Sequence, residues 1–265
     1  MTFFFNVPSY DLTKVSRDFE NEFLNLDENQ LDEVIKIMKE KNMFKELNYK
    51  IFTLTSKIVT KNIYMIPSLI AQFFENEIDF KEYGISTCTP DHIVDVYKDC
   101  YETLAIIIPV IEMLNNIKYR GKYNCYDSNN KNIEKSFKES NGNRINSINW
   151  KEYFSTLFTK KLDKIIRNSI GHNDYTYDPI TQKITFKDKR LVKEMYLLEF
   201  VMECIENIFS LINIENLLYY LERRKLITEG QKSEYMLTEY KRKIERNEKC
   251  LCGSGKKYKK CHGSQ

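Results

Sequence analysis

Hydrophobic positions in this chain recur mostly three or four residues apart, which is the spacing of an amphipathic helix. Residues 91–115 follow this spacing, and Thr89-Pro90 in front of them supplies a cap and a first-turn proline. Residues 150–166 repeat the pattern with aromatic and aliphatic side chains at i, i+3, i+4 and i+7. The same spacing predicts further helices over residues 31–63 and 67–80, and one or two helices over residues 191–221.

Two stretches interrupt the helical pattern. Residues 121–149 are polar and rich in Asn, Lys and Ser, which indicates an exposed loop or a partly helical insert. Residues 174–187 alternate aromatic and β-branched side chains around Asp178-Pro179, which predicts a short β-hairpin. A charged helix is expected over residues 228–248, leading into the cysteine-rich end of the chain.

Composition narrows the fold class. Hydrophobic residues make up 42% of the 265 residues and aromatics 13%, which excludes an extensively disordered chain. Only 8 glycines and 5 prolines are present, too few for the many turns of an all-β sandwich or barrel. We therefore expect an all-α protein: a helical bundle with a short β-hairpin insert and a small, cysteine-rich C-terminal tail.

The expected organisation has four parts. They are an N-terminal helical region over residues 1–85, a helical bundle over residues 86–225 that includes the polar insert 121–149, a charged linker helix over residues 226–249, and the tail over residues 250–263. The most apolar stretch, residues 104–111, is far shorter than the ~20 residues that cross a bilayer. Residues 1–10 also lack the basic region and cleavage site of a secretory signal. We expect a cytoplasmic protein without a membrane partner.

The end of the chain carries a spacing typical of a metal site. Seven cysteines are present, and the last three combine with a histidine as Cys-x-Cys-x8-Cys-His, formed by Cys250, Cys252, Cys261 and His262. Three thiolates and one imidazole suit tetrahedral zinc, and four protein ligands leave no position for water. The zinc is therefore expected to be structural. Basic residues gather here too: the twenty residues 241–260 hold nine Lys or Arg and two acids, whereas the whole chain has a net charge of +3.

These C-terminal residues resemble the SEC-C motif, a small zinc tail found on many otherwise unrelated proteins. Lys249 and Leu251 stand where the family often has prolines, and neither is a ligand. The resemblance implies that the tail docks to a protein or a ribosome as an accessory to the main activity.

A second set of polar residues follows the apolar stripe of residues 150–166. Arg167 and Asn168 come directly after it, Gly171 is suited to end the helix, and His172 would then project from the turn. Arginine presents a planar fork to phosphate oxygens, histidine moves protons near neutral pH, and Asn168 could orient either group. Such groups suit metal-independent RNA cleavage by the 2′-hydroxyl. The alternative is that Arg167 and Asn168 lie at an ordinary helix end, followed by a polar turn.

The Arg-Asn-x3-His segment resembles the Arg-x4-6-His motif of the HEPN superfamily, whose members are small helical bundles that usually dimerise. The resemblance implies that Arg167 and His172 form a catalytic pair, with Asn168 supporting them. Many HEPN domains are endoribonucleases in toxin, stress and antiphage systems, whereas others bind nucleotides or proteins without catalysis. We therefore expect a metal-independent endoribonuclease that leaves a 2′,3′-cyclic phosphate on its RNA product. The alternative is a non-catalytic adaptor that docks on a protein or ribosome through its tail.

A homodimer is expected, because two copies would more easily surround one scissile phosphate. The stripe from Trp150 to Phe158 offers apolar surface for a symmetric contact, unless it is part of the core. Other polar residues are set aside: His92 is expected to face solvent, Cys100 and Cys204 to lie in the core, and Asp174 and Tyr177 to be at most supporting residues.

Overall fold

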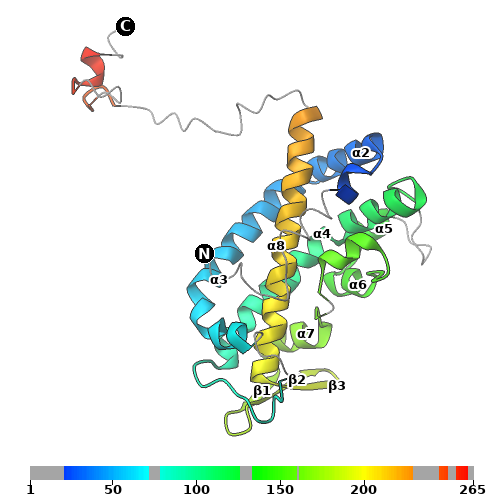
Figure 1. The fold of residues 1–265 in the computed structure, drawn as a ribbon, viewed down its shortest axis with the longest axis vertical. Coiled ribbons are helices and arrows are strands. Elements are labelled where there is room, and N and C mark those ends of the chain that lie inside the picture. The colour runs from blue at the N-terminus through cyan, green and yellow to red at the C-terminus, as the bar shows by residue number, and fades with distance from the viewer. Residues whose placement is uncertain are drawn as a thin grey trace. The chain divides into compact units, whose positions relative to one another are not determined.

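The computed structural model describes residues 21–71, 78–125, 133–159, 161–228, 245–249 and 255–261. This part of the chain is mostly helical and contains one small antiparallel sheet. The chain divides into two units, Met1–Lys225 and Leu226–Gln265. The elements are α2 (Glu28–Glu40), α3 (Met43–Ala71), η2 (Pro90–His92), α4 (Val94–Arg120), α5 (Ile133–Lys138), α6 (Asn141–Asn146), η3 (Tyr153–Leu157), α7 (Lys164–His172), β1 (Tyr175–Asp178), β2 (Lys183–Asp188), β3 (Leu191–Tyr196), α8 (Leu197–Thr228) and η5 (Tyr258–Lys260) (Figure 1).

Helix α4 is the centre of the larger unit. Helices α2, α3, α6 and α7 and the short η3 all pack against it. Among the described helices, α4 is the one whose length and hydropathy would allow it to cross a membrane, but 83% of its most apolar window is buried inside the protein. It is therefore a core helix. The chain leaves it at Gly121, whose φ of 78° is a conformation that glycine adopts without strain.

One hydrophobic core joins the helices on both sides of residue 85. Leu47 of α3, Leu104 of α4 and Leu217 of α8 are all fully buried members of it. The polar insert contributes too, because α5 and α6 each bury an isoleucine, Ile133 and Ile145. Of the two alternatives for residues 121–149, the described part is thus a partly helical insert. Most of the expected linker helix over residues 226–249 lies outside the described residues, and α8 runs as far as Thr228.

The sheet is larger than the expected hairpin. Strands β1, β2 and β3 lie side by side in that order, and both pairs are antiparallel. The prediction that residues 191–196 begin a helix is wrong, since they form β3. A turn with Lys189 at φ 58° reverses the chain after β2, so the following residues pair with β2 before α8 begins. The fold is therefore mostly helical, as expected, and a small three-stranded antiparallel sheet takes the place of the expected short hairpin.

The predicted helix over residues 150–166 is also wrong. The chain forms the short η3, and α7 begins only at Lys164, after residues that are not helical where the structure describes them. Side chains of α4 and α8 satisfy the backbone of this segment, so it does not need helical hydrogen bonds. Tyr97 Oη donates to the carbonyl of Lys161 and accepts from the amide of Asp163, both at 2.9 Å. The α8 side chains of Ser210 and Asn213 hold Thr159 N at 2.7 Å and Leu157 O at 3.1 Å.

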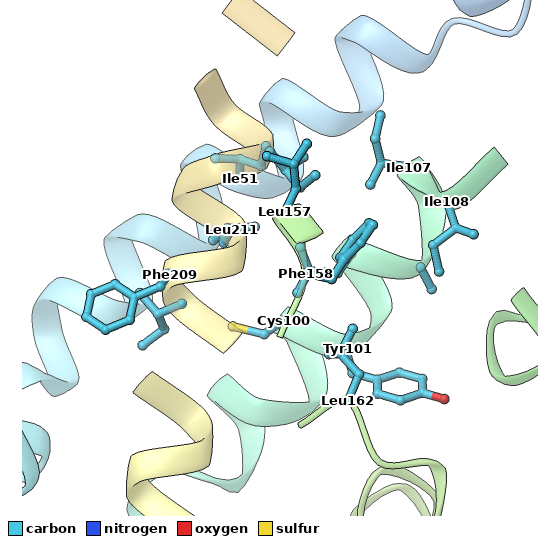
Figure 2. Close-up of a cluster of buried hydrophobic side chains, with 14 of the residues drawn as sticks. Ile51, Cys100, Tyr101, Ile107, Ile108, Leu157, Phe158, Leu162, Phe209 and Leu211 are labelled. Carbon is cyan, nitrogen blue, oxygen red and sulfur yellow. The ribbon is translucent and has the colours of Figure 1, made fainter. Parts of the chain in front are cut away.

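The same segment supplies apolar side chains to the core. Leu157, Phe158 and Leu162 project into a cluster with residues of α3, α4 and α8, as Figure 2 shows. Phe154 is fully buried and Leu157 and Phe158 are 5% exposed. The stripe from Trp150 to Phe158 is thus mainly core, with Trp150 and Tyr153 partly buried.

Two other predicted helices begin and end at residues that differ from those expected. The residues expected to form one helix from 31 to 63 form α2 and α3, which are separated by a turn with Asn42 at φ 56°. Pro67, expected to start a new helix, lies inside α3. Thr89 and Pro90, by contrast, are the cap and first residue of η2, directly before α4, as predicted.

Candidate functional site

The three residues of the Arg-Asn-x3-His segment all lie on α7. This helix begins at the cap Asp163, whose Oδ1 accepts from Ile165 N at 2.7 Å. It continues through Gly171 to His172 and ends at Asn173, which adopts the left-handed conformation at φ 55°. Asparagine tolerates this conformation better than most residues. The expectation that Gly171 ends the helix and that His172 projects from a turn is therefore wrong.

Arg167 and His172 consequently point in different directions. Residues five apart in a continuous helix differ by about 140° around its axis. Arg167 is half-buried and faces α4, whereas His172 is exposed and makes no hydrogen bond or ion pair with the described residues. The structure places the two side chains on one short helix without bringing them together.

Arg167 is held by a network that joins four elements. Its guanidinium forms an ion pair with Glu102 of α4, and its Nη1 donates to Asn168 Oδ1 at 2.9 Å. Asn168 in turn donates through Nδ2 to Asp188 Oδ2 of β2 at 2.8 Å. On the other side, the second carboxylate oxygen of Glu102 accepts from Asn141 of α6. Asn168 thus accepts a hydrogen bond from the guanidinium, while the two acids hold both residues in place.

Sequence reasoning missed Glu102 and Asp188, because each lies far from α7 in the chain. One signal was available for Glu102, since it is the lone charged residue in the otherwise apolar or uncharged stretch 100–111. A carboxylate in such a stretch needs a partner once its helix is packed. Nothing in the local pattern of β2 singles out Asp188.

The end of α7 is fastened to the sheet by Ser169, another residue that the pattern did not single out. Its Oγ donates to the carbonyl of Asp174 and accepts from Lys187 N at 3.1 Å. Asp174 N also donates to Ser169 O at 2.8 Å, and Lys187 N to Asp174 O at 3.0 Å. Asp174 therefore supports the site through its backbone. Tyr177 lies on β1 opposite Ile184, and burial raises the pKa of its hydroxyl, with smaller contributions from Cys88 and Asp178.

A buried hydroxyl lies on α4 next to Glu102. Tyr101 is fully buried, and its Oη has no hydrogen-bond partner among the described residues. Burial raises the pKa of Tyr101 to about 12, and Arg167 opposes this effect in part. The hydroxyl is thus neutral and a donor at physiological pH.

His92, Cys100 and Cys204, to which the sequence analysis gave no part in the site, have structural roles. His92 stacks on Tyr64 with ring centroids 4.0 Å apart, and its Nδ1 accepts from Thr89 N at 3.0 Å, so it caps η2. Cys100 and Cys204 are fully buried, and burial raises the pKa of both thiols well above the ordinary value. The prediction that these two cysteines belong to the core is confirmed.

The C-terminal tail is described over residues 245–249 and 255–261. Lys249 and Lys257 form an antiparallel bridge, and Tyr258 N donates to Glu248 O at 2.7 Å. This fold-back brings the chain just before Cys250 against the chain that leads through η5 to Cys261. Gly255, at φ 71°, lies in the part that returns.

Of the four expected zinc ligands, only Cys261 is among the described residues, and it is half-buried. Within that part of the chain, no group of three or more His, Cys, Asp or Glu residues could hold a metal ion. Cys250, Cys252 and His262 lie outside the described residues.

In the described part of the tail, the segment before Cys250 thus pairs with the segment that leads to Cys261. Residues 246–264 match the SEC-C motif, a motif that is often zinc-binding. The match covers the tail alone. No curated protein and no solved structure matches the chain.

Proposed function

We propose that the chain is a metal-independent endoribonuclease of the HEPN type, a toxin or a phage-defence or stress effector, acting in the cytoplasm. One observation carries the proposal: an oriented guanidinium and a free imidazole, Arg167 and His172, lie on the same short helix. Arg167 is fixed by Glu102 and Asn168, yet its side chain is 32% exposed, so an RNA phosphate could reach it. His172 is exposed and available to move a proton.

The proposed reaction needs a contact on each side of α7. The Cα atoms of an α-helix lie only ~2.3 Å from its axis. An RNA strand lying across the C-terminal end of α7 could therefore meet both side chains, despite their divergence. His172 would take the proton of the 2′-hydroxyl, whose oxygen forms a bond to the adjacent phosphorus. The bond from phosphorus to the 5′-oxygen breaks, and that oxygen takes a proton from the solvent as it leaves. Arg167 would stabilise the charge on the phosphate.

The tail is proposed to hold one structural zinc ion through Cys250, Cys252, Cys261 and His262. The donor set suits the metal, and the bridge between Lys249 and Lys257 brings together the two chain segments that carry the ligands. With four protein ligands, zinc would serve to stabilise a segment too short to fold on apolar burial. By this proposal the tail docks to a protein or a ribosome.

The decisive experiment incubates the purified protein with total RNA in EDTA and compares it with His172→Ala. Cleavage by the wild type should leave 2′,3′-cyclic phosphates, and the variant should be at least about 100-fold slower. Thr176→Ala, at an exposed position on the neighbouring strand β1, is the matched control and should cleave like the wild type. Equal rates for the wild type and His172→Ala would rule out the proposed role.

The ion pair between Arg167 and Glu102 favours a second function, because the carboxylate of Glu102 already pairs with the guanidinium that is proposed to bind phosphate. In this case the chain is a non-catalytic adaptor. The wild type would then leave RNA intact in the assay above. Deleting residues 249–265 would abolish its binding to a protein or ribosome, while His172→Ala would bind normally.

A further inference from the structure

Helix α3 has two apolar faces, and only one of them is covered. Leu47, Leu54 and Met65 lie on the face that packs into the core. The opposite face carries a row of large side chains that remain exposed: Tyr49 (71%), Phe52 (72%), Val59 (51%), Ile63 (60%), Ile66 (44%) and Ile70 (58%). We call these six residues, together with Ser56, the α3 seam.

The α3 seam has the spacing of a coiled coil. Its positions 49, 52, 56, 59, 63, 66 and 70 alternate steps of three and four residues over three heptads. This repeat keeps one narrow stripe facing a partner helix along its whole length. A helix that merely covers its own core does not need such a stripe on its solvent side.

The polar groups within this face can be buried at little cost. Thr53 Oγ1 donates to Tyr49 O at 2.9 Å, Ser56 Oγ to Phe52 O at 3.1 Å, and Thr60 Oγ1 to Lys57 O at 2.8 Å. Each hydroxyl proton is thus already satisfied by the helix itself. Covering the face with a partner would leave none of these three donors unpaired.

The face is also uncharged. From Asn48 to Ile70, the positions that flank the seam hold only Asn, Thr, Pro and Leu. The lysines Lys57 and Lys61 instead pair with Asp95 and Asp99 of α4. Coiled coils use charges at the flanking positions to select an unlike partner. A neutral face meets an identical face without repulsion, which favours a second copy of this chain.

The exposed area matches what a stable dimer needs. Six large apolar side chains, mostly more than half exposed, amount to on the order of 700 Å² per copy, close to the ~800 Å² that each partner of a standard interface buries. In Figure 1 the C-terminal half of α3 lies on the other side of α8 from α7. The seam therefore provides an interface that needs no residue from α7.

We propose that the protein forms a homodimer in which the α3 seam packs against the α3 seam of a second copy, with the helices crossing at about 20°. A twofold axis makes this contact self-complementary and closed, so it stops at two copies. The inference does not rest on RNA cleavage, since a dimer would form whether or not His172 is catalytic.

The test measures the mass of the full-length protein at micromolar concentration by sedimentation and light scattering. The wild type should have twice the chain mass of 31.7 kDa. Ile63→Glu and, separately, Phe52→Glu should raise the dissociation constant at least about 30-fold, because each buries a charge at the interface. Both positions are exposed in the single chain, so both variants should keep the wild-type circular dichroism spectrum.

The matched control is Ile180→Glu, which places the same charge at a 92% exposed isoleucine in the turn after β1. This variant should remain a dimer. A monomeric wild type would overturn the proposal, and so would a dimer that persists in both seam variants. A wild-type monomer that dimerises only after deletion of residues 1–20 would also overturn it, because the seam would then be covered by the chain's own N-terminal segment.

Discussion

Arg167 of α7 pairs with Glu102 of α4 across 65 positions of sequence, and this pair ties the proposed site to the core helix. Through Asn168 and Asn141 the same contacts extend to β2 and α6. The guanidinium therefore has a structural role whatever its role toward RNA. That role determines which substitutions can report on catalysis.

Arg167→Ala should be less stable than the wild type, whereas His172→Ala should not. Removing the guanidinium leaves the three-quarters buried carboxylate of Glu102 without its counterion, at a cost of about 1–2 kcal/mol in the free energy of unfolding. His172 is exposed, so its truncation should change stability by less than about 0.5 kcal/mol. Urea unfolding followed by circular dichroism measures both. Equal losses of stability in the two variants would contradict a structural role of the Arg167 network. Because Arg167→Ala also changes stability, a catalytic role is better tested with His172→Ala.

Two buried tyrosines of α4 should respond differently to loss of the hydroxyl group. Tyr97→Phe removes the group that satisfies both Lys161 O and Asp163 N, so it should lower the free energy of unfolding by about 1–3 kcal/mol. Tyr101→Phe removes a hydroxyl with no hydrogen-bond partner among the described residues, and it should be neutral or slightly stabilising. Each variant is the control for the other in urea unfolding. A larger loss of stability for Tyr101→Phe than for Tyr97→Phe would show that the backbone at Lys161 and Asp163 is held in another way.

The ion pairs between α3 and α4 should make stability depend on pH at acid values. Burial alone would raise the pKa of Asp95, but Lys61 and Lys57 more than offset it and hold that pKa below its ordinary value of 3.8. The unfolded chain therefore binds this proton more readily than the folded chain. The stabilisation is full above pH 3.8 and is lost as the pH falls through the lower pKa of the folded state.

We expect Asp95→Asn to be less stable than the wild type near neutral pH by up to about 1 kcal/mol, since the pair is partly exposed. The difference should decrease as the pH falls below 3.8 and should disappear once the pH is below the lower pKa of Asp95 in the folded state. Thermal unfolding of both proteins between neutral and strongly acid pH measures this gap. A gap that stays constant through that range would show that Asp95 contributes only by packing.

Zinc binding should depend on the four donors of the tail. The intact protein should contain one equivalent of zinc, and Cys250→Ser should bind it far more weakly, because it lacks one thiolate ligand. Cys125→Ser, which changes a cysteine of the larger unit, is the control and should retain the metal. Elemental analysis of the purified proteins measures this. Equal zinc in Cys250→Ser and the wild type would exclude the proposed ligand set.

The longest helices were predictable because the hydrophobic spacing and the local signals agree. The apolar run and Thr89-Pro90 located the start of α4 closely, and the run of Leu, Ile and Phe after residue 197 is long enough to exclude a strand. Burial of Cys100 and Cys204 followed from their places in these patterns. The SEC-C motif was visible in the local spacing Cys-x-Cys-x8-Cys-His, which does not depend on distant parts of the chain.

Residues 150–166 have a helical pattern of equal quality, yet the described residues between η3 and α7 are not helical. Hydrophobic spacing reports which side chains are buried, and here it was correct, since Phe154, Leu157 and Phe158 are all in the core. It does not report which groups satisfy the backbone. Tyr97, Ser210 and Asn213 do so from 51 to 66 positions away in the sequence, and no local pattern contains that information.

The sequence by itself determined the residue types of the proposed site, the burial of α4 and the SEC-C motif of the tail. Only the tertiary structure decided that α7 continues past Gly171, that Arg167 and His172 diverge, and that Glu102 and Asp188 hold the site. The physical reason is that chain reversals bring distant polar groups together, and burial then requires them to pair. The exposure of the α3 seam was decided in the same way, because both faces of α3 are apolar and only packing selects which face is covered.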